Sequence, residues 1–220
     1  MIVQIYEVSS AGEAAALAAC GVDHIGVLVG DGAFPREIKP AAARAIFNAC
    51  PATARRVALS LSADPAAIER ILIEGRPDIL HLGAAPELLS TAMVAALKAR
   101  YLHVPVMRSI PVTDQSSIAL AQQYDGIADF LLLDTHDPGD RQIGALGRTH
   151  DWAISCRIVD SVAIPVILAG GLGPDNVAAA IDAVRPTGVD SKTKTDRPDG
   201  AGKDLVAVQR FVSAARRASG

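Results

Sequence analysis

The 220-residue chain has few aromatic residues, 4% of the total, and it lacks several patterns that mark familiar protein classes. No stretch approaches the roughly 20 apolar residues that a membrane-spanning helix needs. The first residues show neither a basic segment nor a long apolar run, so we expect no secretory signal. Acidic and basic residues are interspersed, and the net charge is −3, which argues against a nucleic-acid or membrane surface. We therefore expect a cytoplasmic protein without nucleic-acid or membrane partners.

Cysteine and metal-ligand patterns are scarce as well. Cys20, Cys50 and Cys156 lie far apart and lack CxxC spacing, which predicts free thiols rather than disulfides or a zinc site. The histidines show no metal-ligand spacing either. We predict no metal and no cofactor.

The chain does contain a repeated alternation of short apolar runs and longer, alanine-rich stretches. Continuous apolar runs between helical patterns are typical of a parallel sheet that is covered by helices. We predict helices at residues 10–20, 40–49, 64–74, 86–99, 114–124, 151–161, 174–184 and 203–218. We predict strands at residues 2–6, 24–29, 56–61, 78–82, 104–108, 129–134, 164–169 and 187–190.

Eight strand–helix units favour an α/β fold, the closed (β/α)8 barrel, which is also called a TIM barrel. We expect residues 1–220 to form it as a single domain. The alternative is an open, doubly wound sheet. Its usual sign, GxGxxG after the first strand, is absent, because "EVSS" (residues 7–10) occupies that place. Ser10 followed by Glu13 predicts a capping box at the first helix. In a TIM barrel, active sites lie at the carboxyl ends of the strands.

Side chains alternate along a strand, and this predicts which of them enter the barrel. Gln4 and Tyr6 in the first strand, His81 in the fourth and Asp134 in the sixth are expected to point inward. Glu7 follows Tyr6 and, in a regular strand, is expected to point away from the barrel mouth. The inward polar side chains are the first candidates for a site.

Three of the candidates have a possible chemical role and also a structural alternative. Asp134 ends the apolar run "FLLLDT", where desolvation would raise its pKa and suit it to act as a general acid; alternatively, it caps the next loop. The imidazole of His81 can exchange protons near neutral pH, or it can be a hydrogen-bonded core histidine. Arg36, in the loop after the second strand, can bind a carboxylate with its guanidinium fork, or it can be solvated.

A phosphate site is predicted after the seventh and eighth strands. Gly170 and Gly171 precede a helix start, where glycine lets the backbone approach an anion and free N–H groups attract phosphate. The alternative is a tight turn that needs glycine for its dihedral angles. Lys192, Thr193 and Lys194 follow the eighth strand and offer phosphate donors, or they form a solvated loop.

Several motifs together resemble the phosphoribosylanthranilate isomerase family of tryptophan biosynthesis, including "FPR" in place of the family's "SPR". The resemblance extends along nearly the whole chain and implies a TIM barrel. It also implies an Amadori rearrangement, in which a phosphoribosylated anthranilate becomes a ketose. The other motifs are "FLLLDT" (130–135), "GALGRTHDW" (144–152), "VILAGGLGPDNV" (166–177), "GVD" (188–190) and "GAGKD" (200–204).

By this resemblance, Asp134 matches the general acid that protonates the ring oxygen of the sugar. Arg36 matches the arginine beside the anthranilate group, Gly170 and Gly171 match the phosphate-binding glycines, and Asp190 matches the aspartate of "GVD". A further part of the resemblance is the family's "GGTGKTFDW" loop, kept in part as Gly144, Gly147, Thr149, Asp151 and Trp152.

The chain departs from the family at the general base. The family's first strand ends in "KICG", whose cysteine removes the C2 proton; the same positions here read "QIYE", with Tyr6 in place of the cysteine. A phenol has a reference pKa near 10, against roughly 8.5 for a thiol, so a tyrosine base would need strong electrostatic help. Tyr6, His81 and Glu7 are therefore the three candidate bases, with Tyr6 and His81 ranked level and Glu7 third.

The phosphate loop also differs, because the family's "GVDVSSGVE" reads "GVDSKTKTD" here. Three hypotheses follow. The first is a phosphoribosylanthranilate isomerase-like enzyme with an altered base. The second is an isomerase, epimerase or lyase for another small phosphorylated, sugar-like substrate, and the third is a non-catalytic relative that binds a metabolite or partner protein. In each case we expect a monomer or a homodimer.

Overall fold

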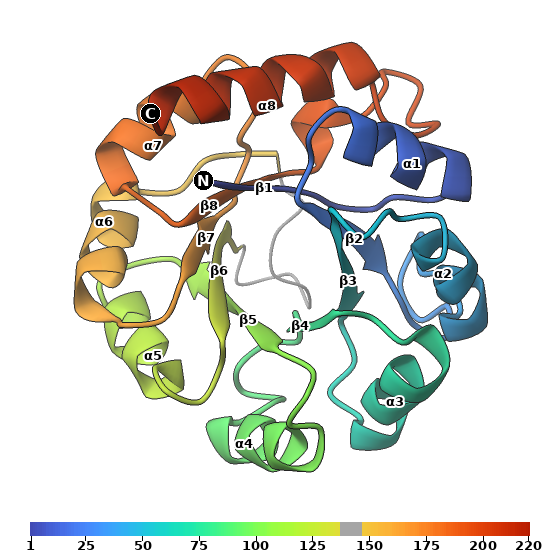
Figure 1. Cartoon of the computed structure of the whole chain (residues 1–220). Helices are drawn as coiled ribbons and strands as arrows, with labels where there is room; N and C mark the ends of the chain where they lie inside the picture. The colour runs from blue at the N-terminus through green and yellow to red at the C-terminus, as the bar shows by residue number, and fades with distance from the viewer. Residues whose placement is uncertain (137–146) are drawn as a thin grey trace.

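The computed structural model describes residues 1–136 and 147–220. Its strands form a closed, parallel barrel in sequence order, and the helices surround it (Figure 1). β1 (Ile2–Ile5) pairs with β8 (Gly188–Ser191), with Ile2 opposite Gly188, and this pairing closes the ring. The predicted (β/α)8 barrel is therefore confirmed.

The remaining strands follow the predicted alternation. They are β2 (His24–Leu28), β3 (Arg55–Ser60), β4 (Ile79–Leu82), β5 (Val106–Val112), β6 (Phe130–Thr135) and β7 (Val166–Leu168). The helices are α1 (Ala11–Ala19), α2 (Pro40–Phe47), α3 (Pro65–Arg70), α4 (Thr91–Arg100), α5 (Ser116–Tyr124), α6 (Trp152–Ser161), α7 (Val177–Val184) and α8 (Leu205–Ala218). A π-helical turn, η1 (Ile71–Gly75), continues α3, and a 3-10 turn, η2 (Thr193–Thr195), follows β8.

Local signals in the sequence set several of these boundaries. Ser10 caps α1 and accepts a hydrogen bond from the backbone N–H of Glu13 at 3.2 Å, which confirms half of the predicted capping box; Glu13 itself accepts the N–H of Ser9 rather than that of Ser10. α7 begins at Val177 rather than at residue 174, because the side chain of Asn176 holds the preceding turn by accepting the N–H of Gly173. β5 extends to Val112 instead of ending at residue 108, and its last residues still pair with β6.

The barrel has an outer and an inner packing layer. The outer layer lies between the strands and the helices and contains alternate strand residues such as Val3 and Ile5. The inner layer fills the barrel and includes Tyr6, Met107 and Leu132, all at most 5% exposed. Because side chains alternate along each strand, the outer face of the barrel packs against the helices, and the inner face carries the polar residues of the strand ends.

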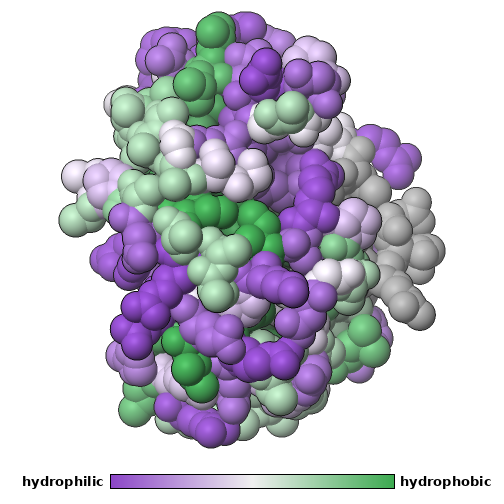
Figure 2. Space-filling model, turned by 90° about the vertical axis from the view of Figure 1, so that its right-hand side faces the viewer, coloured by the Kyte–Doolittle hydropathy of each residue, from purple (hydrophilic) through white to green (hydrophobic). Residues whose placement is uncertain are grey.

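The two ends of the described chain meet at β1. Arg216 of α8 donates hydrogen bonds to the carbonyl oxygens of Met1 and Gly21 and pairs with Asp23. On the side of the molecule seen in Figure 2, hydrophilic residues predominate, and hydrophobic ones gather in a short band near its centre. Among the described residues, no helix combines the length and the apolar character that crossing a membrane requires.

Candidate active site

A cavity opens at the carboxyl ends of the strands. It brings together all four residues predicted as catalytic and two of those predicted to bind substrate. Leucines 28, 59, 61 and 132 form its apolar wall. The polar residues that line it are Tyr6, Glu7, His81, Ser109, Asp134, Asp190 and Lys192.

Asp134 presents its carboxyl group to this cavity from the end of β6, as strand alternation predicts. Burial raises its pKa from 3.8 to about 7, although the backbone N–H of Thr135 donates a hydrogen bond to Oδ1 at 2.7 Å. A carboxyl group with such a pKa is partly protonated at neutral pH. It can therefore deliver a proton to a bound substrate.

Asp190, on β8, is the second buried carboxyl group of the cavity. Burial raises its pKa well above 3.8, and the nearby charge of Asp134 raises it further. Its Oδ1 accepts a hydrogen bond from Nε2 of Gln4 at 3.2 Å, while Oε1 of Gln4 lies 3.0 Å from Nδ1 of His24. The two neighbouring acids thus disfavour each other's ionisation, which keeps a proton available in the mouth.

Tyr6 and His81 form a hydrogen-bonded row with Ser109. The Tyr6 hydroxyl lies 2.5 Å from Nδ1 of His81, and Nε2 of His81 lies 2.7 Å from the Ser109 hydroxyl. Burial raises the pKa of Tyr6 well above 10 and lowers the pKa of His81 to about 3. Both groups are therefore neutral at neutral pH, and both imidazole nitrogens have a partner.

The Tyr6 ring occupies space that Gly26 of β2 leaves free. A Cβ atom at Gly26 would lie 2.2 Å from the ring. The tyrosine at the end of β1 and the glycine of the neighbouring strand are thus packed as a pair. This dependence was not predicted from the sequence.

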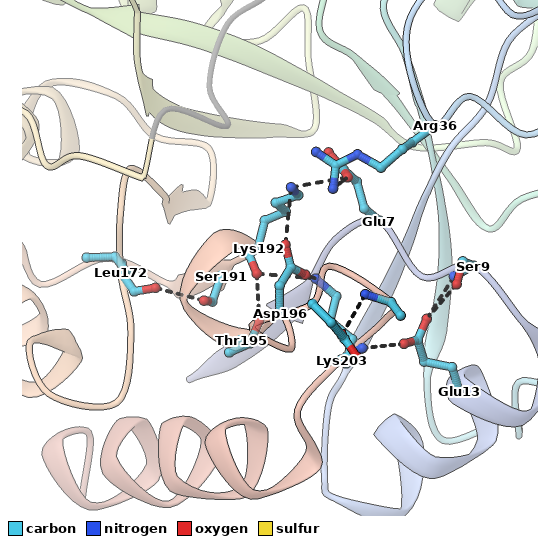
Figure 3. Close-up of polar contacts among 12 residues, drawn as sticks. Glu7, Ser9, Glu13, Arg36, Leu172, Ser191, Lys192, Thr195, Asp196 and Lys203 are labelled. Carbon is cyan, nitrogen blue, oxygen red and sulfur yellow. Dashed lines mark hydrogen bonds and ion pairs between the residues drawn. The ribbon is translucent and has the colours of Figure 1, made fainter.

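Glu7 does not point away from the mouth, contrary to our expectation. Its backbone has φ of 60°, so the chain leaves the extended conformation immediately after Tyr6. The carboxylate therefore enters the cavity, where Oε2 lies 2.9 Å from Nη1 of Arg36 and 3.3 Å from Nζ of Lys192 (Figure 3). The expectation failed because it assumed a regular strand at this residue.

Arg36 and Lys192 thus meet at the carboxylate of Glu7 from two different loops (Figure 3). The side chain of Arg36 is 56% exposed, whereas that of Lys192 is 12% exposed. Lys192 also pairs with Asp196 at 3.2 Å. Lys192 therefore forms part of the wall, and Arg36 remains accessible to a ligand.

Below Lys192, a buried network holds the loop that follows β8. Nζ of Lys203, whose side chain is fully buried, lies 2.5 Å from Oδ1 of Asp196 and donates to the carbonyl oxygen of Lys192 at 3.2 Å (Figure 3). The backbone N–H of Lys203 donates to Oε1 of Glu13, and Oε2 of Glu13 accepts the N–H of Ser9. These contacts tie the loop after β8 to the loop after β1.

The loop after β7 has the features of an anion site. Gly170 and Gly171 have φ of 84° and 62°, and added Cβ atoms would clash with Thr135 and Arg148, respectively. Within the described residues, the backbone N–H groups of Gly170, Gly171 and Thr193 donate no hydrogen bond. Such free donors at a glycine-rich turn suit a phosphate group.

Thr193 and Lys194 are exposed and flank this loop rather than the cavity beside Asp134. A Cβ atom at Gly147 would touch the Thr193 side chain at 3.3 Å, and one at Gly173 would lie 2.7 Å from Cβ of Lys194. The three residues predicted to bind phosphate therefore lie in two places. Lys192 lines the cavity beside Asp134, whereas Thr193 and Lys194 border the glycine turn.

Two of the remaining motif residues belong to the start of α6. Asp151 caps α6 by accepting the N–H of Ala153 at 2.8 Å, and Trp152 begins that helix. Thr149 lies between Gly147 and His150, and Nε2 of His150 lies 2.7 Å from the hydroxyl of Ser155. Gly144 lies outside the described residues.

The sequence did not identify some residues that support the site, because a single serine, asparagine or lysine does not by itself indicate a function. Ser109 holds His81, and Asn176 braces the glycine turn by donating to the carbonyl oxygen of Gly171 at 3.2 Å. Lys203 appeared only within the "GAGKD" motif. The inward position of Ser109 in β5, next to the strand that bears His81, was the available clue.

The fold and these contacts define a class: a TIM barrel with a polar cavity at the strand ends and a glycine turn with free N–H groups after β7. Comparison with known proteins gives the family. The protein-family model described as N-(5'-phosphoribosyl)anthranilate isomerase matches residues 7–214 of this chain. The chain belongs to the phosphoribosylanthranilate isomerase family.

Individual relatives agree with this assignment. An N-(5'-phosphoribosyl)anthranilate isomerase of Methanocella arvoryzae is 36% identical, covering 93% of this chain and 92% of the relative. The enzyme of the same name from Haloferax volcanii is 37% identical, covering 99% and 94%. The solved phosphoribosyl anthranilate isomerase of Thermus thermophilus is 26% identical, covers 99% of both chains and superposes with a TM-score of 0.78.

Proposed function

We propose that the protein is an aldose–ketose isomerase that converts N-(5'-phosphoribosyl)anthranilate into its ketose by an Amadori rearrangement in tryptophan biosynthesis. The observation that carries the proposal is that Asp134, half-buried at the strand ends of a family member, lines the cavity, where burial raises its pKa to about 7. The relatives' names supply the substrate.

The first chemical step is opening of the sugar ring. Asp134, in its protonated form, donates a proton to the ring oxygen while the nitrogen lone pair forms a C=N bond at C1. The product is an open-chain iminium ion. Asp190 lies close enough to Asp134 for the two charges to interact. The two acids therefore resist being ionised together, and one proton tends to stay in the cavity.

The polar ends of the substrate have matching groups. The phosphate fits the free N–H groups of Gly170, Gly171 and Thr193, with Lys194 at the border of the turn. The anthranilate carboxylate fits the accessible guanidinium of Arg36. One solved relative is described in complex with reduced 1-(o-carboxyphenylamino)-1-deoxyribulose 5-phosphate, a ligand that carries both anionic groups.

The second step removes the proton on C2. The C–H electron pair forms a C1=C2 bond, and the electrons of the C=N bond return to nitrogen. In the conversion of the enolamine to the ketose, C1 gains one proton and O2 loses one. The base gives up the proton it took and Asp134 regains the proton it donated, so the composition does not change. A base is required at the mouth, where Tyr6, His81 and Glu7 are the candidates.

Turnover tests the proposal. Purified protein mixed with freshly prepared N-(5'-phosphoribosyl)anthranilate should remove the anthranilate-type fluorescence faster than buffer does. Asp134→Asn is the matched control, since it keeps the shape of the side chain but cannot act as the acid. Absence of turnover above the buffer rate at high enzyme concentration contradicts the proposal.

One observation favours a different substrate in place of the anthranilate compound: the lysines in the loop after β8. Lys192 and Lys194 stand where the family has serine and glycine, so another phosphorylated, sugar-like compound would find more positive charge there. A thermal-shift screen of phosphosugars distinguishes the two cases. A strong stabiliser other than the anthranilate compound, without anthranilate turnover, supports the second substrate, whereas ligand binding without any reaction supports a non-catalytic relative.

A further inference from the structure

We infer that Glu7 is the general base that removes the C2 proton, one residue after the position where the family places its cysteine. This inference rests on the proposed isomerase function. It goes beyond that function by naming the base and by assigning Tyr6 to the wall of the cavity.

The first argument is the backbone at Glu7. A φ of 60° is uncommon for a residue with a side chain and favours glycine, which is the residue of the family's "KICG" at this position. Here, a glutamate adopts this conformation. Strained residues of this kind concentrate at functional sites, and this one directs a carboxylate into the cavity that contains Asp134.

The second argument is the set of contacts that the carboxylate makes. Oε2 forms ion pairs with Nη1 of Arg36 at 2.9 Å and with Nζ of Lys192 at 3.3 Å, and these contacts position the group at the mouth. Within the described part of the chain, no hydrogen bond or ion pair involves Oε1. One oxygen therefore positions the group, and the other is free to accept a proton.

The third argument excludes the other two candidates on geometry. Both ring nitrogens of His81 are engaged, Nδ1 with Tyr6 and Nε2 with Ser109, so His81 has no lone pair free for a substrate. The Tyr6 hydroxyl is engaged with His81. Burial also raises the pKa of the phenol and lowers the pKa of the imidazole, which makes a phenolate or an imidazolium costly at neutral pH.

The balance of the step is simple. Oε1 of Glu7 takes the C2 proton, the C–H pair forms the C1=C2 bond, and the positive charge on nitrogen is neutralised. The carboxyl group of Glu7 then gives this proton to C1 as the enolamine becomes the ketose. The proton on O2 passes to Asp134, so both carboxyl groups regain their starting states. No oxidant, reductant or metal is consumed.

Arg36 links substrate binding to this base. It is the most exposed member of the ion-paired group, and it is also the group that fits the substrate carboxylate. A bound carboxylate that draws Arg36 away would leave Glu7 paired with Lys192 alone. Binding of the correct substrate would thereby remove one of the two cations that hold the Glu7 carboxylate.

Kinetics of four variants test the inference. Glu7→Gln and Glu7→Gly should each lower kcat by about 10²–10⁴-fold with little change in KM, because a base acts in the transition state. Tyr6→Phe removes one hydrogen bond and should lower kcat by less than about tenfold. Glu69→Gln is the matched control; it neutralises an ion-paired glutamate of α3 outside the mouth and should behave as wild type.

Two further readouts separate a base from a structural glutamate. Glu7→Gly should melt within a few degrees of wild type, because glycine is suited to positive φ. Deuterium at C2 of the substrate should slow Glu7→Gln more than wild type, since proton removal then limits the rate. An active wild type with a Glu7→Gln variant within tenfold of it overturns the inference, whereas an inactive wild type overturns the proposed function instead.

Discussion

At the scale of single residues, burial determines which proton the site can donate. Asp134 and Asp190 line one cavity, burial raises both their pKa values, and the charge of Asp134 raises that of Asp190 further. Glu7 lies at the same mouth but is paired with two cations. The mouth therefore contains two kinds of carboxyl group: Asp134 and Asp190, whose pKa values burial raises, and the ion-paired Glu7.

We expect the rate to fall as pH rises through about 7, the pKa to which burial raises Asp134. Above that pH, the acid has lost the proton that opens the sugar ring. A pH profile of kcat/KM checks this result. A rate that is unchanged from about pH 6 to about pH 8 would contradict the role of Asp134.

Asp134→Asn should also change stability in a pH-dependent way. The folded state binds the Asp134 proton more tightly than the unfolded chain does, so ionisation costs stability as pH rises from about 4 to about 7. The variant should therefore exceed wild type by roughly 1–3 kcal/mol at about pH 8 and approach it near pH 4. Urea unfolding at both pH values measures this difference, and a variant less stable at the higher pH would refute the assigned burial cost.

At the scale of elements, the end of β1 depends on its neighbour β2. Gly26→Ala should destabilise the protein by about 1–3 kcal/mol, because the added Cβ would clash with the Tyr6 ring. The matched control is Gly12→Ala in α1, where no atom lies within 4 Å of the new Cβ and helix propensity favours alanine. Denaturant unfolding compares the two, and in a Tyr6→Ala background the Gly26→Ala penalty should shrink. An equal penalty in both backgrounds would contradict direct packing.

The loop after β8 depends on its buried ion pair. Asp196→Asn leaves Lys203 buried without its carboxylate and should cost about 3–5 kcal/mol. Asp175→Asn breaks the exposed pair with Arg210 and should cost no more than about 1 kcal/mol. The free energies of unfolding of the two variants should therefore differ clearly. Similar losses would mean that the Lys203 network does not hold the loop.

The sequence predicted the elements better than it predicted the ends of the strands. Alternation correctly placed Tyr6, His81 and Asp134 in the barrel, because the period of a strand is fixed by its backbone. It failed for Glu7, where one positive φ reverses the expected direction. The division between Lys192 and Lys194 also escaped prediction, since it depends on contacts with distant residues such as Glu7 and Gly173.

At the scale of the whole molecule, barrel closure brings the site together. β1 and β8 are at opposite ends of the sequence but pair directly, so Tyr6 and Glu7 meet Asp190 and Lys192. β6, which is separated from β8 by β7 alone, contributes Asp134 (Figure 1). An acid and a base thus face one cavity only when the barrel is complete.

The decisive measurement follows C1 of the sugar during the reaction. N-(5'-Phosphoribosyl)anthranilate labelled with carbon-13 at C1 should, with wild-type enzyme, convert its C1 signal from a ring CH into the CH2 of an amino-ketose. Asp134→Asn and Glu7→Gln should show this conversion only at a greatly reduced rate. If C1 remains a CH group with wild-type enzyme, or changes no faster than in buffer, the protein is not the isomerase proposed here.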